Sequence, residues 1–519
     1  MQRQQMISRL AEGGEWDICV IGGGATGLGI AVDAASRGLR TVLFERFDFA
    51  KGTSSRSTKL VHGGVRYLQQ GNIRLVMDAL SERGLMMKNA PHLVRNLSFV
   101  IPNYEWWESP FYGVGLKAYD WMAGNLGLGS TEFLSLEETL IAAPTLDPEG
   151  LRGGIRYHDG QFDDARMAIH LAMTAADHGA VVLNYFSVEG LLKVGGNICG
   201  VNVKDAFTSE TYEIKAKAVI NATGVFSDAI LHMDDPEAET LVSPSQGIHL
   251  VLDKEFLPAE TAIMIPRTND GRVLFAVPWH QKIIVGTTDT PVGVASVEPR
   301  AQSDEIDFVL QTMRHYLMKD PSYADIKSVF CGLRPLVKGG GKTASLSRDH
   351  HITVSDSGLI TIAGGKWTTY RKMAEDAVNV AVQRADLSAA LSGTSELPIH
   401  GYQEQTDFES PLYYYGSDKA HILDMIQKDP ELGEKIHPAF DNVKAEIVWA
   451  AKEEMCEAIE DFLARRSRML FLDVKASVEA APIVAELMAA CLVKDTGWVQ
   501  KQINEYTLLA KIYLPSINS

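Results

Sequence analysis

A glycine-rich segment near the N-terminus has the residue types and spacing of a phosphate-binding turn. Residues 17–21 predict a buried strand, and residues 22–27 follow with the pattern Gly-x-Gly-x-x-Gly. Such glycines let the N-terminus of the next helix, expected at residues 28–37, approach a pyrophosphate closely. Glu45 ends a second predicted strand, where a carboxylate can accept hydrogen bonds from a ribose 2′-hydroxyl. The pattern predicts a site for FAD or NAD in preference to NADP, and a purely structural glycine turn is the alternative. The residues expected to bind the nucleotide here are Gly22, Gly24, Ala25, Thr26, Gly27 and Glu45.

A dense polar run, residues 53–67, follows this acidic residue directly. Its hydroxyl and amine side chains can donate hydrogen bonds to a pyrophosphate or to the edge of a flavin ring. A polar loop, or a cluster that caps the following helix, is the alternative interpretation. The position just after the ribose-binding acid favours the cofactor role. The expected cofactor-binding residues in this run are Thr53, Ser54, Ser55, Thr58, Lys59, His62 and Gly63.

Two further turns of small residues follow predicted strands at residues 218–221 and 359–363. The second turn opens a helix expected to reach about residue 384. The amides and positive dipole at the start of such a helix stabilise negative charge on a bound group, whereas a merely structural helix start is the alternative. The residues expected to join the cofactor site from these turns are Ala222, Thr223, Gly224, Gly364, Gly365, Lys366 and Thr368.

Composition excludes several classes of protein. The 519 residues are too many for one hydrophobic core, so two or three domains are expected. A net charge of −17 disfavours a nucleic acid partner. The five cysteines are scattered without a CxxC pair, which predicts no metal site and a reducing, cytoplasmic setting. The polar residues 1–16 do not resemble a signal peptide, and we find no apolar run of about 18 residues, so no transmembrane helix is expected.

The order of predicted strands and helices indicates an α/β protein of several interleaved domains, which as a whole is an α+β multi-domain arrangement. Residues 1–90, 150–240 and 328–390 are expected to form a discontinuous Rossmann-like domain. Residues 91–149 and 241–327 are expected to form a mixed or antiparallel β-sheet domain over the cofactor. Residues 395–519 are expected to form an all-helical domain, in which residues 445–471 have the apolar spacing of one amphipathic helix.

Short motifs distributed between residues 17 and 385 carry a specific resemblance, because they occur together in a fixed order. They lie at residues 21–27, 53–68, 163–166, 221–224, 286–289, 332–336, 347–349 and 364–372. The arginine-rich residues 465–468 in the helical tail add to them. With these motifs the sequence resembles the FAD-dependent glycerol-3-phosphate dehydrogenases of the respiratory type.

The resemblance implies that the cofactor is FAD and that the substrate is sn-glycerol 3-phosphate. Arg334 and Arg348 look like phosphate ligands, because guanidinium groups pair with phosphate oxygens bidentately. Arg66 and Tyr67 look like further substrate contacts close to the flavin. The helix after Lys366 would face the N1/O2 edge of the flavin and stabilise the reduced ring.

The sequence leaves open which of several residues is the general base. His249 is the first candidate, because a near-neutral imidazole accepts a hydroxyl proton as hydride leaves the carbon. His62 competes, although it belongs to the flavin-binding run. Lys366 could orient the hydroxyl or lower its pKa. The expected catalytic residues are His249, Lys366 and Arg334, and all three also belong to the expected substrate site.

The electron acceptor is open as well. The leading hypothesis is a peripheral enzyme on the cytoplasmic face of the inner or plasma membrane that passes electrons to quinone. The alternatives are a soluble oxidase that forms hydrogen peroxide, a related flavin-dependent amine or hydroxy-acid oxidoreductase, and a flavin-binding module without turnover. Residues 106–122 are rich in aromatic side chains and predict either a membrane-surface patch or a packed contact, including one within a homodimer.

Overall fold

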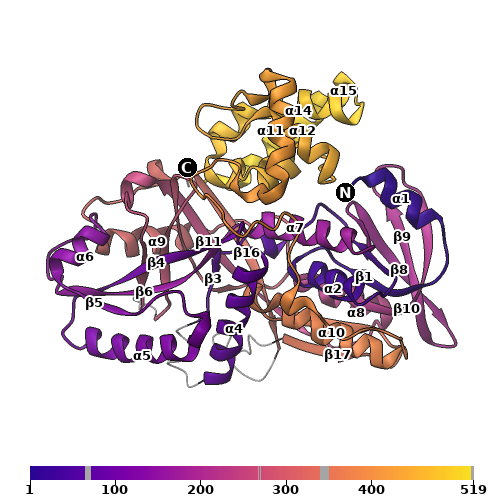
Figure 1. Cartoon of the computed structure of the whole chain (residues 1–519), viewed down its shortest axis with the longest axis horizontal. Helices are drawn as coiled ribbons and strands as arrows, with labels where there is room; N and C mark the ends of the chain where they lie inside the picture. Colours follow the sequence, from indigo (N-terminus) through magenta and orange to yellow (C-terminus); the bar gives the residue numbers. More distant parts are fainter. Residues whose placement is uncertain (65–71, 267, 269–270, 339–349, 516–519) are drawn as a thin grey trace.

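The computed structural model describes residues 1–64, 72–266, 268, 271–338 and 350–515. Two β-sheets lie side by side, and the C-terminal helices cover them from one side (Figure 1). The predicted fold class, an α/β multi-domain protein with a Rossmann-like sheet, a second mixed sheet and a helical C-terminal part, is confirmed.

The first sheet is the Rossmann-like one, with strand order β17-β18-β10-β1-β2-β7. Neighbouring strands from β18 to β7 run parallel, and β17 is antiparallel to β18. Strands β8 and β9 extend β10 as an antiparallel ribbon. The strands are β1 (Trp16–Ile21), β2 (Thr41–Phe44), β7 (Val181–Leu183), β8 (Phe186–Val194), β9 (Asn197–Asp205), β10 (Thr211–Asn221), β17 (His350–Val354) and β18 (Ile360–Gly364).

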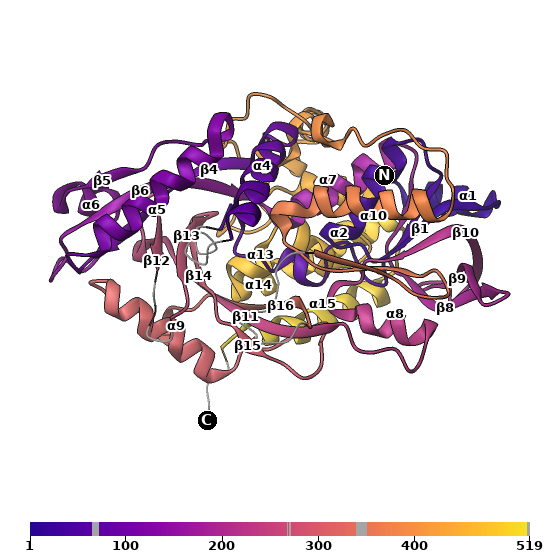
Figure 2. The ribbon, with the colours of Figure 1, turned by 90° about the horizontal axis from the view of Figure 1, so that it is seen from below.

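Alternating side chains of β1 pack on the two faces of this sheet. Ile18 and Val20 face a core shared with α2 (Ala25–Ser36), α7 (Asp164–Asp177) and α10 (Tyr370–Arg384). Cys19 and Ile21 face the opposite core, which includes α1 (Arg3–Ala11), the β8–β9 ribbon and α8 (Ser227–Asp234). Helices α2 and α10 lie over the same part of the sheet (Figure 2). Burial on both faces explains why β1 is apolar from Ile18 to Ile21.

The second sheet has the strand order β15-β11-β14-β13-β12-β4-β6-β3, with β16 paired to β11 and β5 paired to β6. Its neighbours are antiparallel, except that β12 runs parallel to β4. Helices α4 (Ile73–Asn89), α5 (Glu108–Ala123), α6 (Leu136–Ala142) and α9 (Ser303–Tyr316) surround it. The strands are β3 (Leu60–Val61), β4 (Val94–Asn103), β5 (Glu132–Leu134), β6 (Gly153–Phe162), β11 (Val242–Asp253), β12 (Ala262–Ile265), β13 (Leu274–Trp279), β14 (Lys282–Gly286), β15 (Thr290–Pro291) and β16 (Ser328–Val337).

Sheet membership differs from the expected domain boundaries at three strands, the first of which is β3, within residues 1–90. Both β6 and β16 belong to the second sheet, although residues 150–240 and 328–390 were assigned to the nucleotide domain. Strand β16 pairs with β11 over ten consecutive residue positions, and β6 pairs with β4 in the same way. The chain therefore passes from the second sheet to the first within each of these segments, so that residues of both sheets meet at their junction.

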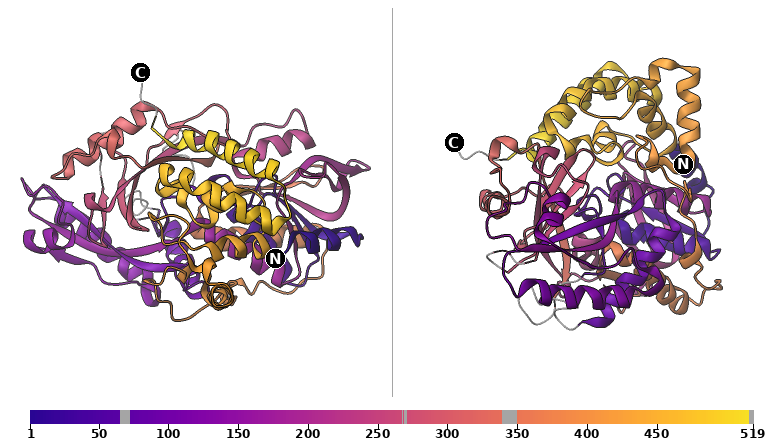
Figure 3. Two further views of the ribbon diagram at one scale, coloured as in Figure 1. Left: turned by 90° about the horizontal axis from the view of Figure 1, so that it is seen from above. Right: turned by 60° about the vertical axis from the view of Figure 1, so that its left-hand side comes forward.

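The C-terminal helical part packs on the second sheet. Its core includes Val251, Trp279, Ile284 and Phe330 from that sheet. The helices lie across the top of both sheets (Figure 3). They are α11 (Lys419–Lys428), α12 (Lys444–Glu453), α13 (Met469–Leu472), α14 (Val474–Leu492) and α15 (Thr496–Ala510).

Residues 445–471 do not form the single amphipathic helix that their spacing predicts. Helix α12 ends at Glu453, Met455 adopts a left-handed φ of 51°, and a π-helical turn spans Asp461–Arg466. The Asp461 carboxylate accepts hydrogen bonds from the amides of Glu457 and Ala458. These side-chain contacts satisfy the backbone where the helix is interrupted.

Candidate active site

Two adjoining cavities lie where the two sheets meet. The nucleotide cavity has a volume of about 320 Å³ and is lined by the glycine fingerprint, Glu45 and the turn after β10. The polar cavity has a volume of about 310 Å³, and its lining includes residues of β11 and β16, residues among 56–64, and the turns at residues 287–289 and 364–368. Each volume is in the range of small-molecule sites. The shared wall consists of Thr53, Pro335, Gly364, Gly365, Lys366 and Trp367.

Glycine is required at two positions of the fingerprint, because a side chain there would meet neighbouring backbone atoms. A Cβ on Gly27 would lie 1.9 Å from the carbonyl oxygen of Gly22, and Gly22 itself has a φ of 108°. The Glu45 carboxylate accepts hydrogen bonds from the amides of Gly23 (2.7 Å) and Phe47 (2.8 Å). Burial raises the pKa of Glu45, although these two hydrogen bonds oppose the shift. The turn is thus tied to the end of β2, where a ribose-binding acid is expected.

Many of the predicted cofactor residues line the cavities. Those on the nucleotide cavity are Gly22, Gly24, Ala25, Thr26, Glu45, Thr53, Ser54, Ala222, Thr223, Gly224, Gly364, Gly365 and Lys366. Those on the polar cavity include Thr58, His62 and Thr368. Gly27, Ser55, Lys59 and Gly63 are not among the lining residues of either cavity.

The predicted residues outside the cavity walls have other contacts. The Lys59 ammonium is buried against Asp164 (2.6 Å) and the Ser55 carbonyl (2.8 Å). The Gly63 amide donates to the Tyr119 hydroxyl. The contacts of Lys59 and Gly63 thus fix residues 53–63 to the rest of the protein and not to the cavity walls. Ser54, in contrast, accepts a hydrogen bond from the Ala25 amide at the start of α2 (2.9 Å).

The Gly-Gly-Lys turn after β18 is shaped by its packing on α10. Gly364 and Gly365 have φ values of 81° and 75°. A Cβ on Gly365 would lie 2.3 Å from the Met373 sulfur. Lys366 then begins a short 3₁₀ turn, Trp367–Thr369, that leads into α10. The amides at this helix start therefore lie at the wall that the two cavities share.

His249 and Arg334 lie on the neighbouring strands β11 and β16 and line the polar cavity. The His249 Nε2 atom is 2.8 Å from the Thr58 hydroxyl, and its ring stacks on Phe330. Arg334 donates to the Thr287 hydroxyl (3.1 Å) and the Asp289 carboxylate (3.3 Å). Burial, and then the charges of Lys59 and Arg334, hold the pKa of His249 well below its usual value. The lowered pKa favours the neutral imidazole, the form that has a lone pair for a proton.

Three predicted substrate residues, Arg66, Tyr67 and Arg348, lie outside the described residues. Conversely, the cavity contains residues that received no role from the sequence, among them Arg56, Thr287 and Asp289. The motif at residues 286–289 was a signal for the last two, because acidic and hydroxyl side chains follow a glycine at a strand end.

The residues present fit FAD. Gly22 and Gly24 of the fingerprint line the nucleotide cavity, which runs from Glu45 to the Gly364–Lys366 turn. That turn also borders a polar cavity with a neutral imidazole and an arginine. A dinucleotide with a redox-active end at the shared wall matches this arrangement. Within the described residues, no group of His, Cys, Asp and Glu has an arrangement that could hold a metal ion.

Fold and cavities together define a FAD-dependent oxidoreductase. Residues 17–371 match the family described as FAD dependent oxidoreductase, and residues 359–502 match the C-terminal domain of alpha-glycerophosphate oxidase.

Relatives that match nearly the whole of this chain narrow the class of protein. The mitochondrial glycerol-3-phosphate dehydrogenase of Macaca fascicularis is 40% identical over 99% of this chain and 75% of its own length. That of Schizosaccharomyces pombe is 38% identical over 99% of this chain and 89% of its own. The glycerol-3-phosphate dehydrogenase of Bacillus halodurans, solved with FAD, is 30% identical, with a TM-score of 0.82 and coverage of 100% of this chain and 98% of that one. The chain belongs to the FAD-dependent glycerol-3-phosphate dehydrogenase family.

Proposed function

We propose that this protein oxidises sn-glycerol 3-phosphate to dihydroxyacetone phosphate and passes the electrons to a membrane quinone. The observation that carries the proposal is the polar cavity with His249 and Arg334, which shares the Gly364–Lys366 turn with the nucleotide cavity. FAD, when bound, accepts the hydride from the alcohol carbon. The protein then has to bind the phosphate, orient the alcohol and accept the hydroxyl proton.

Arg334 binds the substrate phosphate in this proposal. Its guanidinium lies at the cavity wall, and hydrogen bonds to Asp289, Thr287 and the Gln246 carbonyl fix its orientation. His249 accepts the hydroxyl proton. With Nε2 donating to Thr58, the neutral ring keeps its lone pair on Nδ1, which has no hydrogen-bond partner among the described residues. Lys366 orients the substrate oxygen from the shared wall.

An anaerobic reduction experiment tests the activity. Adding sn-glycerol 3-phosphate to the oxidised holoenzyme should bleach the flavin absorbance. Bleaching by an amino acid or a hydroxy acid, and not by sn-glycerol 3-phosphate, would overturn the substrate assignment.

Arg334→Ala tests the phosphate site. Loss of a charged hydrogen-bonding group should raise KM by roughly 10- to 100-fold. Arg314→Ala is the matched control, because Arg314, on α9, donates to the Pro321 carbonyl and does not line the polar cavity. Equal KM values for the two variants would remove Arg334 from the substrate site.

Association with the cytoplasmic face of a membrane fits the surface of α5. The aromatic side chains of Trp106 (74% exposed), Phe111 (56%) and Trp121 (84%) lie at or on this helix. Figure 1 shows α5 at the edge of the molecule opposite the C-terminal helices. Tryptophan favours the interface between lipid and water, so this face can bring the enzyme to its quinone. None of the described helices is both long and apolar enough to cross a bilayer.

Flotation with phospholipid vesicles tests whether the α5 surface binds a membrane. Wild-type protein should float with the vesicles, and Trp106→Ser/Trp121→Ser should remain in the soluble fraction. Loss of a dimer in this variant, without any flotation of the wild type, would instead assign the face to a homodimer contact. Turnover with a soluble quinone analogue without hydrogen peroxide supports quinone as acceptor, and stoichiometric peroxide would indicate an oxidase.

A further inference from the structure

Asp164, the first residue of α7, accepts hydrogen bonds from two distant parts of the chain although it lines neither cavity. Its Oδ2 atom accepts from the Ser57 amide (3.0 Å), the Ser57 hydroxyl (2.7 Å) and the Lys59 ammonium (2.6 Å). Its Oδ1 atom accepts from Arg468 Nη2 (3.0 Å), which comes from the C-terminal helical part. Asp164 is thus the common acceptor for residues 57–59 and for the C-terminal helices.

Burying these charged side chains lowers the stability of the folded state. The side chains of Lys59 and Asp164 are both 0% exposed, and that of Arg468 is 2% exposed. Burial lowers the pKa of Lys59 to about 7 despite the attraction of Asp164. Lys59 and Arg468 also adopt left-handed φ angles of 63° and 65°, which side-chain-bearing residues rarely populate. Well-packed apolar residues would often stabilise such a place better, so the cluster calls for a reason beyond stability.

The residue between the two anchored positions is Thr58. Its hydroxyl lies 2.8 Å from His249 Nε2 at the wall of the polar cavity. Ser57 on one side and Lys59 on the other are both held by Asp164, so the backbone of Thr58 is fixed from both directions. One face of the imidazole stacks on the ring of Phe330, with 4.7 Å between the ring centroids.

We propose that Asp164 is a positioning residue for the proton-accepting step, acting through Thr58 on the orientation and tautomer of His249. The proposal rests on the proposed function, in which His249 accepts the substrate proton. With Thr58 held as the acceptor for Nε2–H, the lone pair of the neutral ring lies on Nδ1. Without the clamp on residues 57–59, the Thr58 hydroxyl moves and the other tautomer becomes populated.

Asp164→Asn and Thr58→Val, alone and combined, form the test on the FAD-loaded enzyme. Asp164→Asn should lower kcat by about 10- to 100-fold, because an imidazole misplaced by a fraction of an ångström is a poor proton acceptor. KM for sn-glycerol 3-phosphate should stay nearly constant, since Arg334 is unchanged. In the Thr58→Val background, Asp164→Asn should have no further effect on kcat, although its effect on thermal stability should persist. Thr58→Ser should restore most of the kcat that Thr58→Val loses.

Asp163→Asn is the matched control, because Asp163 is the neighbouring buried carboxylate and caps α7 through the Ala165 and Arg166 amides. It should lower the melting temperature while kcat stays within about twofold. If Asp164→Asn does not fold, Ser57→Ala removes one donor of the clamp and should lower kcat several-fold at constant KM.

Three results would overturn the inference. They are a wild-type kcat in Asp164→Asn, effects of Asp164→Asn and Thr58→Val that multiply, and a loss of activity that follows the loss of bound FAD measured by absorbance. Failure of the proposed function gives a different result, because the wild type would then not be reduced by sn-glycerol 3-phosphate at all.

Discussion

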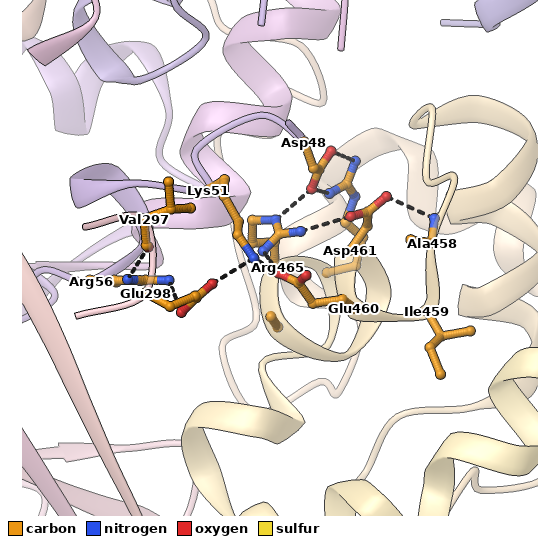
Figure 4. Close-up of polar contacts among 12 residues, drawn as sticks. Asp48, Lys51, Arg56, Val297, Glu298, Ala458, Ile459, Glu460, Asp461 and Arg465 are labelled. Carbon is orange, nitrogen blue, oxygen red and sulfur yellow. Dashed lines mark hydrogen bonds and ion pairs between the residues drawn. The ribbon is translucent and has the colours of Figure 1, made fainter. Parts of the chain in front are cut away.

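Neutralising Asp48 should destabilise the contact between the C-terminal helices and the cofactor segment. Asp48 is fully buried and accepts from Arg465 Nε at 2.6 Å, from both terminal nitrogens of Arg466, and from the Asn184 amide at 3.1 Å. Figure 4 shows Asp48 and Arg465 within a chain of charges that continues through Glu460 and Lys51 to Glu298. In Asp48→Asn, the shape is kept but two buried guanidinium groups lose their shared counter-charge.

The expected loss follows from burial. Removing one partner of a buried ion pair costs about 3–5 kcal/mol. Asn keeps one carbonyl oxygen, and Asp461 still pairs with Arg465 at 2.7 Å. Burial and the neighbouring Asp48 raise the pKa of Asp461 to about 6, so losing the Asp48 charge favours its ionised form. These compensations place the expected loss near the lower limit, about 3 kcal/mol.

Urea unfolding followed by circular dichroism and by release of FAD measures this loss. Asp253→Asn is the matched control, because Asp253 pairs with Lys282 and Lys327 with its side chain 40% exposed. An exposed pair of this kind should contribute less than about 1 kcal/mol. We expect FAD release at a lower urea concentration in Asp48→Asn alone, because residues 45–47 and 50–54, on either side of Asp48, line the nucleotide cavity. Equal unfolding free energies for the two variants would refute the reasoning.

Two other predictions concern the glycine turn and pH. Gly27→Ala should be purified without FAD, because its Cβ would lie 1.9 Å from the Gly22 carbonyl oxygen. Gly115→Ala is the control and should keep its full complement of FAD, because a Cβ at Gly115 has no atom within 4 Å. Equal flavin absorbance per protein in the two variants would contradict this prediction. Burial opposes protonation of His400, but hydrogen bonds to Asp177 (2.6 Å) and Asp418 (2.9 Å) raise its pKa to about 9. Because the folded-state pKa is raised, this contribution is complete below about pH 6.5 and is lost as the pH rises to about 9, a change of about 1–3 kcal/mol. Melting temperatures of the wild type should therefore fall more steeply across this window than those of His400→Gln, and parallel curves would exclude His400 as the cause.

The sequence by itself determined the local units of this protein. The strand, glycine turn, helix and acidic strand end at residues 17–45 follow from backbone constraints that act over a few residues, so their order could be predicted. The Gly364–Lys366 turn is local in the same way, since its left-handed backbone requires glycine. The family resemblance then gave the cofactor and the substrate class.

Tertiary structure decided how distant segments meet. Strands β6 and β16 join the second sheet because their pairing partners, β4 and β11, lie there, and the sequence of a strand does not by itself specify its neighbour. The break in residues 445–471 was also hidden, because a 3.6-residue apolar period does not reveal a side chain that competes for the backbone amides.

Buried charges were the least predictable part of the site. Asp164 and Arg468 are 304 residues apart in the chain and meet only because the C-terminal helices pack on the sheets. A charged residue in a sequence is expected at the surface, and only its folded partner makes burial tolerable. The sequence therefore named His249 and Arg334, whereas the fold alone decided that Thr58, held by Asp164, contacts His249.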